Sequence, residues 1–264
     1  MLGSARVAVI RDSDSDVIRD SDIGVLRDSD IGVLRESDID VVVFDILGTL
    51  VDEPGGLKAG IRAALPVSDE AAVEELLAVW QGHVEHEQRR IAQGDRPYAP
   101  SEVIDAEAAR QVGGSVGLTD PAALARPATA SRCLPPWEDS VAGLDRLAGR
   151  FPVLGLSNAG RPALSRLNAH AGLRRHQVLS GEAVLAYKPA PDIYQLALDT
   201  AGCPPERVLM VAAHAWDLRA AQAAGMRTAY VRRPAGDPPT RADAFDGQFD
   251  GLAPLARALT ATTR

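Results

Sequence analysis

Two kinds of apolar pattern alternate along the chain after residue 40. Short, continuous apolar runs predict strands, and stretches with apolar residues three or four positions apart predict helices. The predicted strands span residues 40–46, 152–157, 177–180, 207–213 and 227–232. The predicted helices span residues 139–149, 161–171, 191–202 and 216–225. Strands that alternate with helices in this way predict an α/β fold, in which a parallel sheet carries helices on both faces.

The first predicted strand ends on a carboxylate. Four apolar residues, Val41 to Phe44, precede Asp45, and Gly48 and Thr49 follow it. Such an apolar run predicts a strand covered on both faces, and open parallel sheets bind their ligands at the carboxyl ends of these strands. Asp45 is therefore a candidate nucleophile. At this point the alternative is a carboxylate that caps the turn into the next helix.

The segment between the first two strands, residues 57–137, shows helical patterns only. Ser68, Ser101 and Thr119 stand at positions typical of N-caps, and the longest predicted helix follows Ser68. A helical insertion directly after the candidate nucleophile would lie above the active edge of the sheet. We therefore expect a cap that closes over the substrate and excludes water. The predicted domains are a core of residues 40–56 and 138–264 and a cap of residues 57–137.

The N-terminal segment has a different character. Residues 9–40 contain an eight-residue repeat, VIRDSDSD, VIRDSDIG, VLRDSDIG and VLRESDID, and the first 40 residues hold ten acids and five arginines. The glycine-rich repeat of calcium-binding β-rolls and the EF-hand loop are both missing from this sequence. We interpret residues 1–39 as a flexible or loosely packed arm, with a strand-like dimerisation arm as the alternative.

Composition limits the partners. A net charge of -8 and an aromatic content of 4% disfavour a nucleic-acid partner. No run approaches the ~20 apolar residues of a membrane span, and no signal peptide is recognisable, so a cytoplasmic location is expected. Cys133 and Cys203 lack metal-ligand spacing and are expected to be free thiols. A homodimer is the expectation from base rates.

Polar residues also follow the later strands, at the same edge of the sheet. Ser157 and Asn158 follow the second strand, Lys188 precedes a proline in the next crossover, and His214 and Asp217 follow the fourth strand. The order Asp-x-x-Gly-Thr, Ser-Asn, Lys-Pro and a final Asp resembles the haloacid dehalogenase superfamily. The segments YKPAPDIYQLAL and VAAHAWDLRAAQAAGM are most similar to its type II, L-2-haloacid dehalogenase, branch.

This resemblance, which covers about residues 40–233, implies a Rossmann-like core with a helical cap. It also implies metal-independent hydrolysis of a small-molecule substrate, a 2-haloalkanoic acid, with no cofactor. Asp45 would displace the halide and form an aspartyl ester, which water then hydrolyses. Lys188 would keep Asp45 ionised. The residues that match positions holding the nucleophile and the substrate carboxylate are Thr49, Ser157 and Asn158.

Three further candidates have structural alternatives. Tyr194 matches a tyrosine that lines the pocket, but it is also explained as a half-buried helix aromatic. Asp217 stands at a helix start, where a carboxylate is favourable for capping alone. His214 replaces the usual asparagine of the family. It is either a general base for ester hydrolysis, oriented by Asp52 or Glu53, or a hydrogen-bonded structural group.

The candidate substrate contacts Leu47 and Gln81 depart from the family pattern. An arginine that receives the halide normally follows a tryptophan in the first long cap helix, and here Gln81 follows Trp80. Nearby arginines are the candidates to replace it: Arg62, Arg89 and Arg90. Leu47 replaces a tyrosine and makes the pocket more apolar, and a serine of the last motif is replaced by Ala212.

The same region argues against a phosphatase. Phosphatase-like members have a second Asp where this chain has Leu47, and an acid for magnesium where it has Ala213. We therefore predict no metal site and take dehalogenation as the leading interpretation. The alternatives are a hydrolase of another electrophilic or ester-like carbon in secondary metabolism, a Mg-dependent phosphatase, and a non-catalytic binding protein on the same scaffold.

Overall fold

The computed structural model describes residues 34, 36–64, 69–118 and 120–261. The eight-residue repeat lies almost wholly outside these ranges, so the predicted state of the arm remains a prediction. Ser68 and Thr119 also lie outside them. Within these ranges no helix is both long and apolar enough to cross a membrane, and Cys133 and Cys203 are free thiols.

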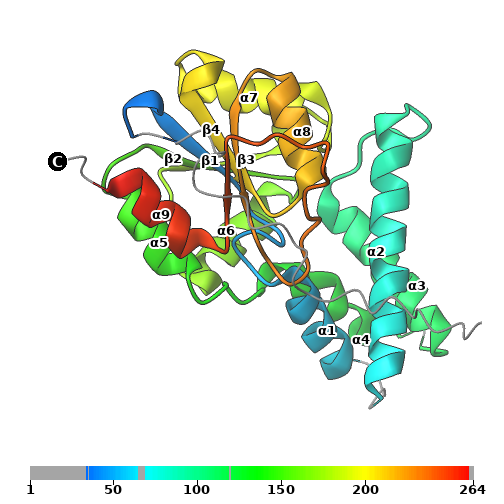
Figure 1. The fold of residues 1–264 in the computed structure, drawn as a ribbon. Helices are drawn as coiled ribbons and strands as arrows, with labels where there is room; N and C mark the ends of the chain where they lie inside the picture. The colour runs from blue at the N-terminus through cyan, green and yellow to red at the C-terminus, as the bar shows by residue number, and fades with distance from the viewer. Residues whose placement is uncertain (1–33, 35, 65–68, 119, 262–264) are drawn as a thin grey trace, which may run out of the picture. The chain divides into compact units, whose positions relative to one another are not determined.

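In the described residues, six parallel strands form one sheet in the order β3-β2-β1-β4-β5-β6 (Figure 1). They span Val41–Asp45 (β1), Val153–Ser157 (β2), Gln177–Ser180 (β3), Val208–Ala212 (β4), Arg227–Val231 (β5) and Gly247–Phe249 (β6). The five predicted strands are confirmed to within one residue at either end. The short β6 was not predicted, because glycine, glutamine and phenylalanine make no apolar run.

Two layers of helices cover the sheet, so the predicted α/β fold is confirmed. The helices are α5 (Ser140–Ala148), α6 (Arg161–Ala171), α7 (Pro191–Ala201), α8 (Ala215–Ala223) and α9 (Leu252–Thr260). Val42 and Phe44 of β1 pack in one apolar cluster with α5, α6 and α9, whereas Val41 and Val43 pack in another with α7 and α8 (Figure 1). Alternate residues of β1 therefore face opposite layers, and β1 is buried along its whole length.

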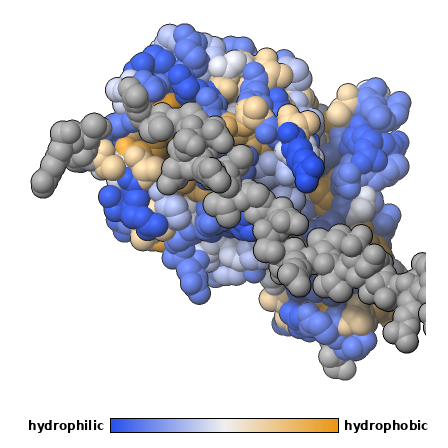
Figure 2. Space-filling model, in the orientation of Figure 1, coloured by the Kyte–Doolittle hydropathy of each residue, from blue (hydrophilic) through white to orange (hydrophobic). Residues whose placement is uncertain are grey.

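The helices between β1 and α5 form the helical insertion, residues 53–132. They are α1 (Glu53–Ala64), α2 (Glu70–Ala92), α3 (Ser101–Ser115), α4 (Pro121–Leu124) and the 3-10 helix η2 (Pro127–Arg132). These helices pack around an apolar cluster of their own, which includes Leu57, Ile61, Leu77 and Trp80. The surface in Figure 2 is mainly hydrophilic with small apolar groups, as expected when the large apolar side chains are buried in such clusters.

The helix starts of the insertion differ in part from the prediction. Asp52 Oδ1 accepts the backbone N–H of Gly55 at 2.9 Å, so the first helix begins four residues before the predicted boundary at 57. Ser101 is not an N-cap: it is the first residue of α3, and its hydroxyl accepts the N–H of Gly160 at 2.8 Å. Asp120 caps α4 through the N–H groups of its second and third residues.

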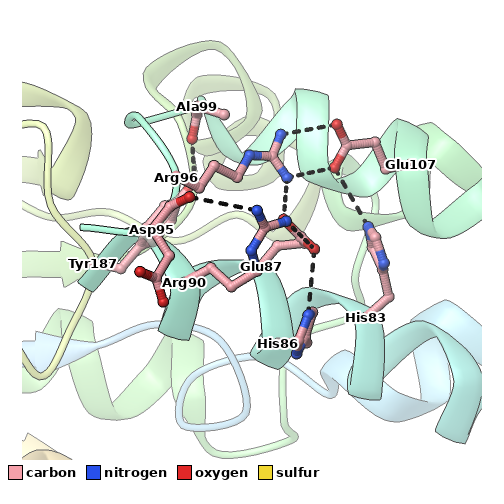
Figure 3. A network of polar contacts seen from close by, with 9 residues as sticks. All are labelled: His83, His86, Glu87, Arg90, Asp95, Arg96, Ala99, Glu107 and Tyr187. Carbon is pink, nitrogen blue, oxygen red and sulfur yellow. Dashed lines mark hydrogen bonds and ion pairs between the residues drawn. The ribbon is translucent and has the colours of Figure 1, made fainter. Parts of the chain in front are cut away.

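An ion-pair network joins α2 to α3 (Figure 3). Arg96, in the connecting loop, makes two hydrogen bonds of 2.8 Å to Glu107 of α3 and one of 2.5 Å to Glu87 of α2. Because Arg96 binds both oxygens of Glu107, it fixes the orientation of that carboxylate as well as its distance. The hydroxyl of Tyr187 donates to the carbonyl of Ala99 at 2.7 Å and ties the same loop to the segment before Lys188. The network therefore fixes α2 above the carboxyl edge of the sheet.

Candidate active site

The carboxylate of Asp45 ends β1 and is held from two sides. Oδ1 accepts a hydrogen bond from Lys188 Nζ at 2.9 Å, and Oδ2 accepts one from Thr49 Oγ1 at 2.6 Å. Thr49 Oγ1 in turn accepts the backbone N–H of Ala213 at 2.9 Å. Because Ala213 directly follows β4, which pairs with β1, the sheet itself places the hydroxyl that orients Asp45.

Lys188 bridges two carboxylates. Its Nζ also donates to Asp217 Oδ2 at 2.7 Å, and the hydroxyl of Tyr194 donates to Asp217 Oδ1 at 2.5 Å. Asp217 is fully buried, and one of these two bonds holds Lys188 in place. Asp217 therefore does more than stabilise the start of α8. The backbone N–H of Lys188 is fixed as well, because it donates to Asn158 Oδ1 at 2.7 Å.

The charges of this cluster keep Asp45 ionised. Burial is the largest single effect and would raise the pKa of Asp45, but the charge of Lys188 together with His214 and Thr49 outweighs it and lowers the pKa. Burial opposes the charge on Lys188 as well, yet Asp217 and Asp45 raise the pKa of the ammonium group. The pKa of Asp217 is raised, because burial and the negative charge of Asp45 outweigh the attraction of Lys188. One ammonium therefore serves two carboxylates, and Asp45 is the one held in its charged form.

His214 approaches the same carboxylate from the start of α8. Its Nδ1 lies 3.4 Å from Asp45 Oδ2. Burial lowers the pKa of the imidazole, but Asp45, with smaller effects of Glu53 and Asp217, raises it overall. Gly48 permits the approach: its φ is +75°, and a Cβ there would lie 2.6 Å from the imidazole Cε1. The glycine of the Asp-x-x-Gly-Thr motif thus makes room for this histidine.

A cavity of about 350 Å³ lies in front of Asp45 and is called the main cavity below. Seven of the ten predicted site residues line it: Asp45, Leu47, Gln81, Ser157, Asn158, Lys188 and His214. The other three, Thr49, Tyr194 and Asp217, are fully buried behind this wall. Tyr194 therefore differs from the expectation of a residue that lines the pocket, because its ring is inside the core and its hydroxyl holds Asp217.

Five residues of the main cavity were not among the predicted site residues: Glu53, Val84, Glu85, Gln88 and Trp216. Gln88 follows Gln81 by seven positions, so the helical period places both on one face of α2. That period would have identified it from the sequence. Its Oε1 accepts a hydrogen bond from Asn158 Nδ2 at 3.2 Å, which links the helical insertion to the end of β2.

The candidate arginines do not replace the halide-binding arginine. Each is paired with a glutamate on the helical insertion: Arg62 with Glu70, Arg89 with Glu85 and Arg90 with Glu87. The residues around the main cavity all fall within the described ranges, and the basic side chains among them are Lys188 and His214. Gln81 therefore contributes an uncharged amide on the side where the family has a positive charge.

Apolar residues stand at the two positions where the sequence analysis places the acids of phosphatase-like members. Leu47 lines the main cavity, and Ala213 offers only its backbone N–H, which is taken by Thr49. In the part of the chain that the structure describes, no three His, Cys, Asp or Glu side chains are grouped so as to hold a metal ion. Lys188 is the charge that these residues place beside the carboxylates.

The parallel sheet and the ionised carboxylate at the end of its first strand define a class of α/β hydrolases. A family model described as haloacid dehalogenase-like hydrolase matches residues 39–225. An (S)-2-haloacid dehalogenase of Pseudomonas putida is 30% identical over 197 residues, which cover 73% of this chain and 85% of the relative. The chain belongs to the haloacid dehalogenase-like hydrolase family.

Solved structures agree with this assignment. The crystal structure of an L-2-haloacid dehalogenase matches with a TM-score of 0.77 at 29% identity, over 85% of this chain and 100% of that chain. The L-2-haloacid dehalogenase of Xanthobacter autotrophicus with chloropropionic acid covalently bound matches with a TM-score of 0.72 at 28% identity, over 85% of this chain and 100% of that chain. The fold predicted from the sequence is therefore that of haloacid dehalogenases.

Proposed function

We propose that this chain hydrolyses the carbon–halogen bond of (S)-2-haloalkanoic acids through a covalent ester on Asp45, without a metal ion. One observation carries the proposal: the carboxylate of Asp45, held by Lys188 and Thr49, faces the main cavity in its ionised form. The names of the relatives support the same substrate class. In this proposal the helices of residues 57–137 act as the cap and the sheet with its flanking helices acts as the core.

In the first step a carboxylate oxygen of Asp45 bonds to C2 of the substrate. The carbon–halogen bond breaks, and its electron pair leaves with the halide. The hydroxyl of Ser157 and the polar groups of Asn158 bind the substrate carboxylate from the end of β2. The amide N–H of Gln81 faces the departing halide. Leu47 supplies apolar surface to the carbon chain.

In the second step water attacks the ester carbonyl carbon and transfers a proton to the imidazole of His214. The acyl–oxygen bond then breaks, and the 2-hydroxy acid leaves with that proton. Asp45 is left as the carboxylic acid, and it is regenerated as the carboxylate when the second proton of the water passes to solvent. The charge of Asp45 is what raises the pKa of His214. Because the ester carries no charge, that pKa falls after the first step, and the neutral imidazole becomes available as a base.

The direct test is chloride release from L-2-chloropropionate, with and without a chelator. We expect equal amounts of chloride and D-lactate, because the displacement inverts C2 and the ester hydrolysis leaves C2 untouched. The rate should not change when the chelator is added. Magnesium-dependent turnover of p-nitrophenyl phosphate without chloride release would overturn the proposal in favour of a phosphatase.

A hydrolase of another electrophilic carbon is the second candidate, and the uncharged Gln81 favours it. Such an enzyme would still use Asp45 as the nucleophile. If no chloride appears but the peptide containing Asp45 gains the mass of a reactive 2-bromo acid less HBr, this second candidate replaces the first. A chain that shows neither reaction would be a binding protein.

A further inference from the structure

A second chamber of about 50 Å³ adjoins the main cavity. The two share five lining residues: Leu47, Glu53, Val84, Gln88 and Asn158. Beyond them the inner chamber is enclosed by residues of the helical insertion and the end of β2: Leu57, Trp80, Ser101, Ile104, Asp105, Ser131 and Ala159. Since one water-sized group needs ~15 Å³ by this measure, the inner chamber has room for about three such groups.

The inner chamber carries two carboxyl groups. Glu53 begins α1 and lines both spaces, whereas Asp105 of α3 lines the inner chamber only. Asp105 is 9% exposed, and in the described part of the chain its only hydrogen bond is the one that Oδ2 accepts from Ser131 at 2.9 Å. Within the same ranges no hydrogen bond reaches the carboxyl of Glu53. Both groups therefore have oxygens free to accept hydrogen bonds.

The wall of the inner chamber holds no positive charge beside these carboxyls, although His214 and Arg132 act on them from outside it. Burial raises the pKa of Glu53 to about 7; His214 opposes this shift, whereas Asp105 and Asp45 add to it. Burial also raises the pKa of Asp105 to about 7. No lysine, arginine or histidine is among the lining residues of the inner chamber, all of which the structure describes. A ligand group that donates hydrogen bonds would pair with the free oxygens of these two carboxyl groups.

Apolar side chains form a further part of the wall, beside the polar groups of Ser101, Ser131, Gln88 and Asn158. Leu57, Trp80 and Ile104 are nearly fully buried and offer only carbon surface along the inner chamber, apart from the indole N–H. A substituent that enters from C2 would therefore pass Glu53 and apolar side chains where the two spaces join before it meets Asp105, which lines the inner chamber only. A plain alkyl end would leave these groups without partners, and an anionic end would be repelled by them.

We propose that the inner chamber binds a short side arm of the substrate that is apolar along its length and ends in a hydrogen-bond donor, a hydroxyl or an ammonium group. This inference rests on the proposed function, because it places the arm on the carbon that Asp45 attacks. It makes Asp105 a determinant of specificity rather than a catalytic residue. The preferred substrate is then a 2-halo acid with a polar-ended side arm.

The test compares three substrates whose arms have equal numbers of non-hydrogen atoms: 2-chloropentanoate, 2-chloro-4-hydroxybutanoate and 2-chloro-4-aminobutanoate. We expect kcat/KM for chloride release to be at least about tenfold higher for one or both polar arms than for 2-chloropentanoate. Asp105→Leu should bring that ratio to within about threefold of unity. Asp105→Asn keeps an acceptor without charge, so it should retain a hydroxyl preference and lose an ammonium preference.

Asp145→Leu is the matched control, because Asp145 is an exposed acid on α5, and its ratio should equal that of the unmodified chain. Equal or faster turnover of 2-chloropentanoate, or a polar preference that survives Asp105→Leu, would overturn the proposed subsite. Pentanoate, 4-hydroxybutanoate and 4-aminobutanoate give the same comparison as dissociation constants. A polar preference in binding without chloride release from any substrate would therefore refute dehalogenation and leave the subsite standing.

Discussion

An Asp45→Asn variant is expected to lose at least about 10⁴-fold in kcat for chloride release, a loss typical for removal of a catalytic nucleophile. A neutral amide does not displace halide from carbon, and the ester intermediate cannot form. The variant should remain folded, because Lys188 keeps its 2.7 Å contact with Asp217 and the pair is then one cation to one anion. Chloride release under steady-state conditions and thermal unfolding measure the two effects separately.

The control for this variant is Asp199→Asn, the same chemical change at an exposed position of α7. Its kcat should stay within about twofold of the unmodified chain, since exposed substitutions away from special features have small effects. Asp45→Ala excludes residual activity from deamidation of the asparagine. If Asp45→Ala released chloride at more than about a tenth of the normal rate, Asp45 would not be the nucleophile.

A Lys188→Met variant should lose about 10³-fold in kcat, comparable with the loss of one electrostatic donor from a preorganised site. Methionine fills a similar volume without charge, so Asp45 and Asp217 then face each other without the cation between them. The pKa of Asp45, which Lys188 holds below its ordinary value, should rise. At a given pH less of the nucleophile is ionised, and the residual kcat should therefore increase with pH from about 5 to about 9.

The same substitution should destabilise the fold by about 3–5 kcal/mol at neutral pH, because it leaves buried carboxylates unpaired. This loss should shrink as the pH falls, since protonation removes the uncompensated charge. The chain has two lysines, and the other one offers a matched control. Lys58→Met breaks a pair with Glu74 whose side chains are 24% and 51% exposed, so the expected cost is at most about 1 kcal/mol. A pH-independent kcat in Lys188→Met would contradict the role of the ammonium.

The sheet could be predicted from the sequence because its strands are buried on both faces. β1, β2 and β4 are continuous apolar runs, and such runs are visible without knowledge of their partners. β6 could not be placed in the same way, whereas α9 was not predicted although Leu252, Leu255, Ala256 and Leu259 have helical spacing. β6 has three residues of mixed character, and it becomes a strand only because it pairs with β5.

The site residues at the ends of the strands could also be predicted, because the topology of a parallel sheet brings them together. Residues that end neighbouring parallel strands must lie at one edge, so Asp45 and Ser157 meet whatever the loops between them contain. The side chains that the helical insertion contributes to the main cavity follow no such rule. Whether an arginine near Gln81 faced the cavity depended on its pairing with glutamates of the same helices, and spacing alone does not determine those ion pairs.

The proximity of Glu53 and Asp105 could not be predicted from their spacing in the sequence either. They lie 52 positions apart in the sequence, and only the packing of α1 and α3 against η2 brings both to one chamber. Their raised pKa values follow from burial, which a sequence pattern indicates poorly for charged residues on amphipathic helices. The inner chamber could therefore be found only from the three-dimensional structure.

A single turnover in H₂¹⁸O, with enzyme in excess over L-2-chloropropionate, tests the covalent step most directly. If Asp45 forms the ester, water supplies its oxygen to the carboxyl group of Asp45. The lactate released then carries ordinary oxygen, and the peptide containing Asp45 gains one ¹⁸O atom. Lactate labelled with ¹⁸O in that first turnover, together with an unlabelled Asp45 peptide, would mean that water attacks C2 directly and would contradict the nucleophilic role of Asp45.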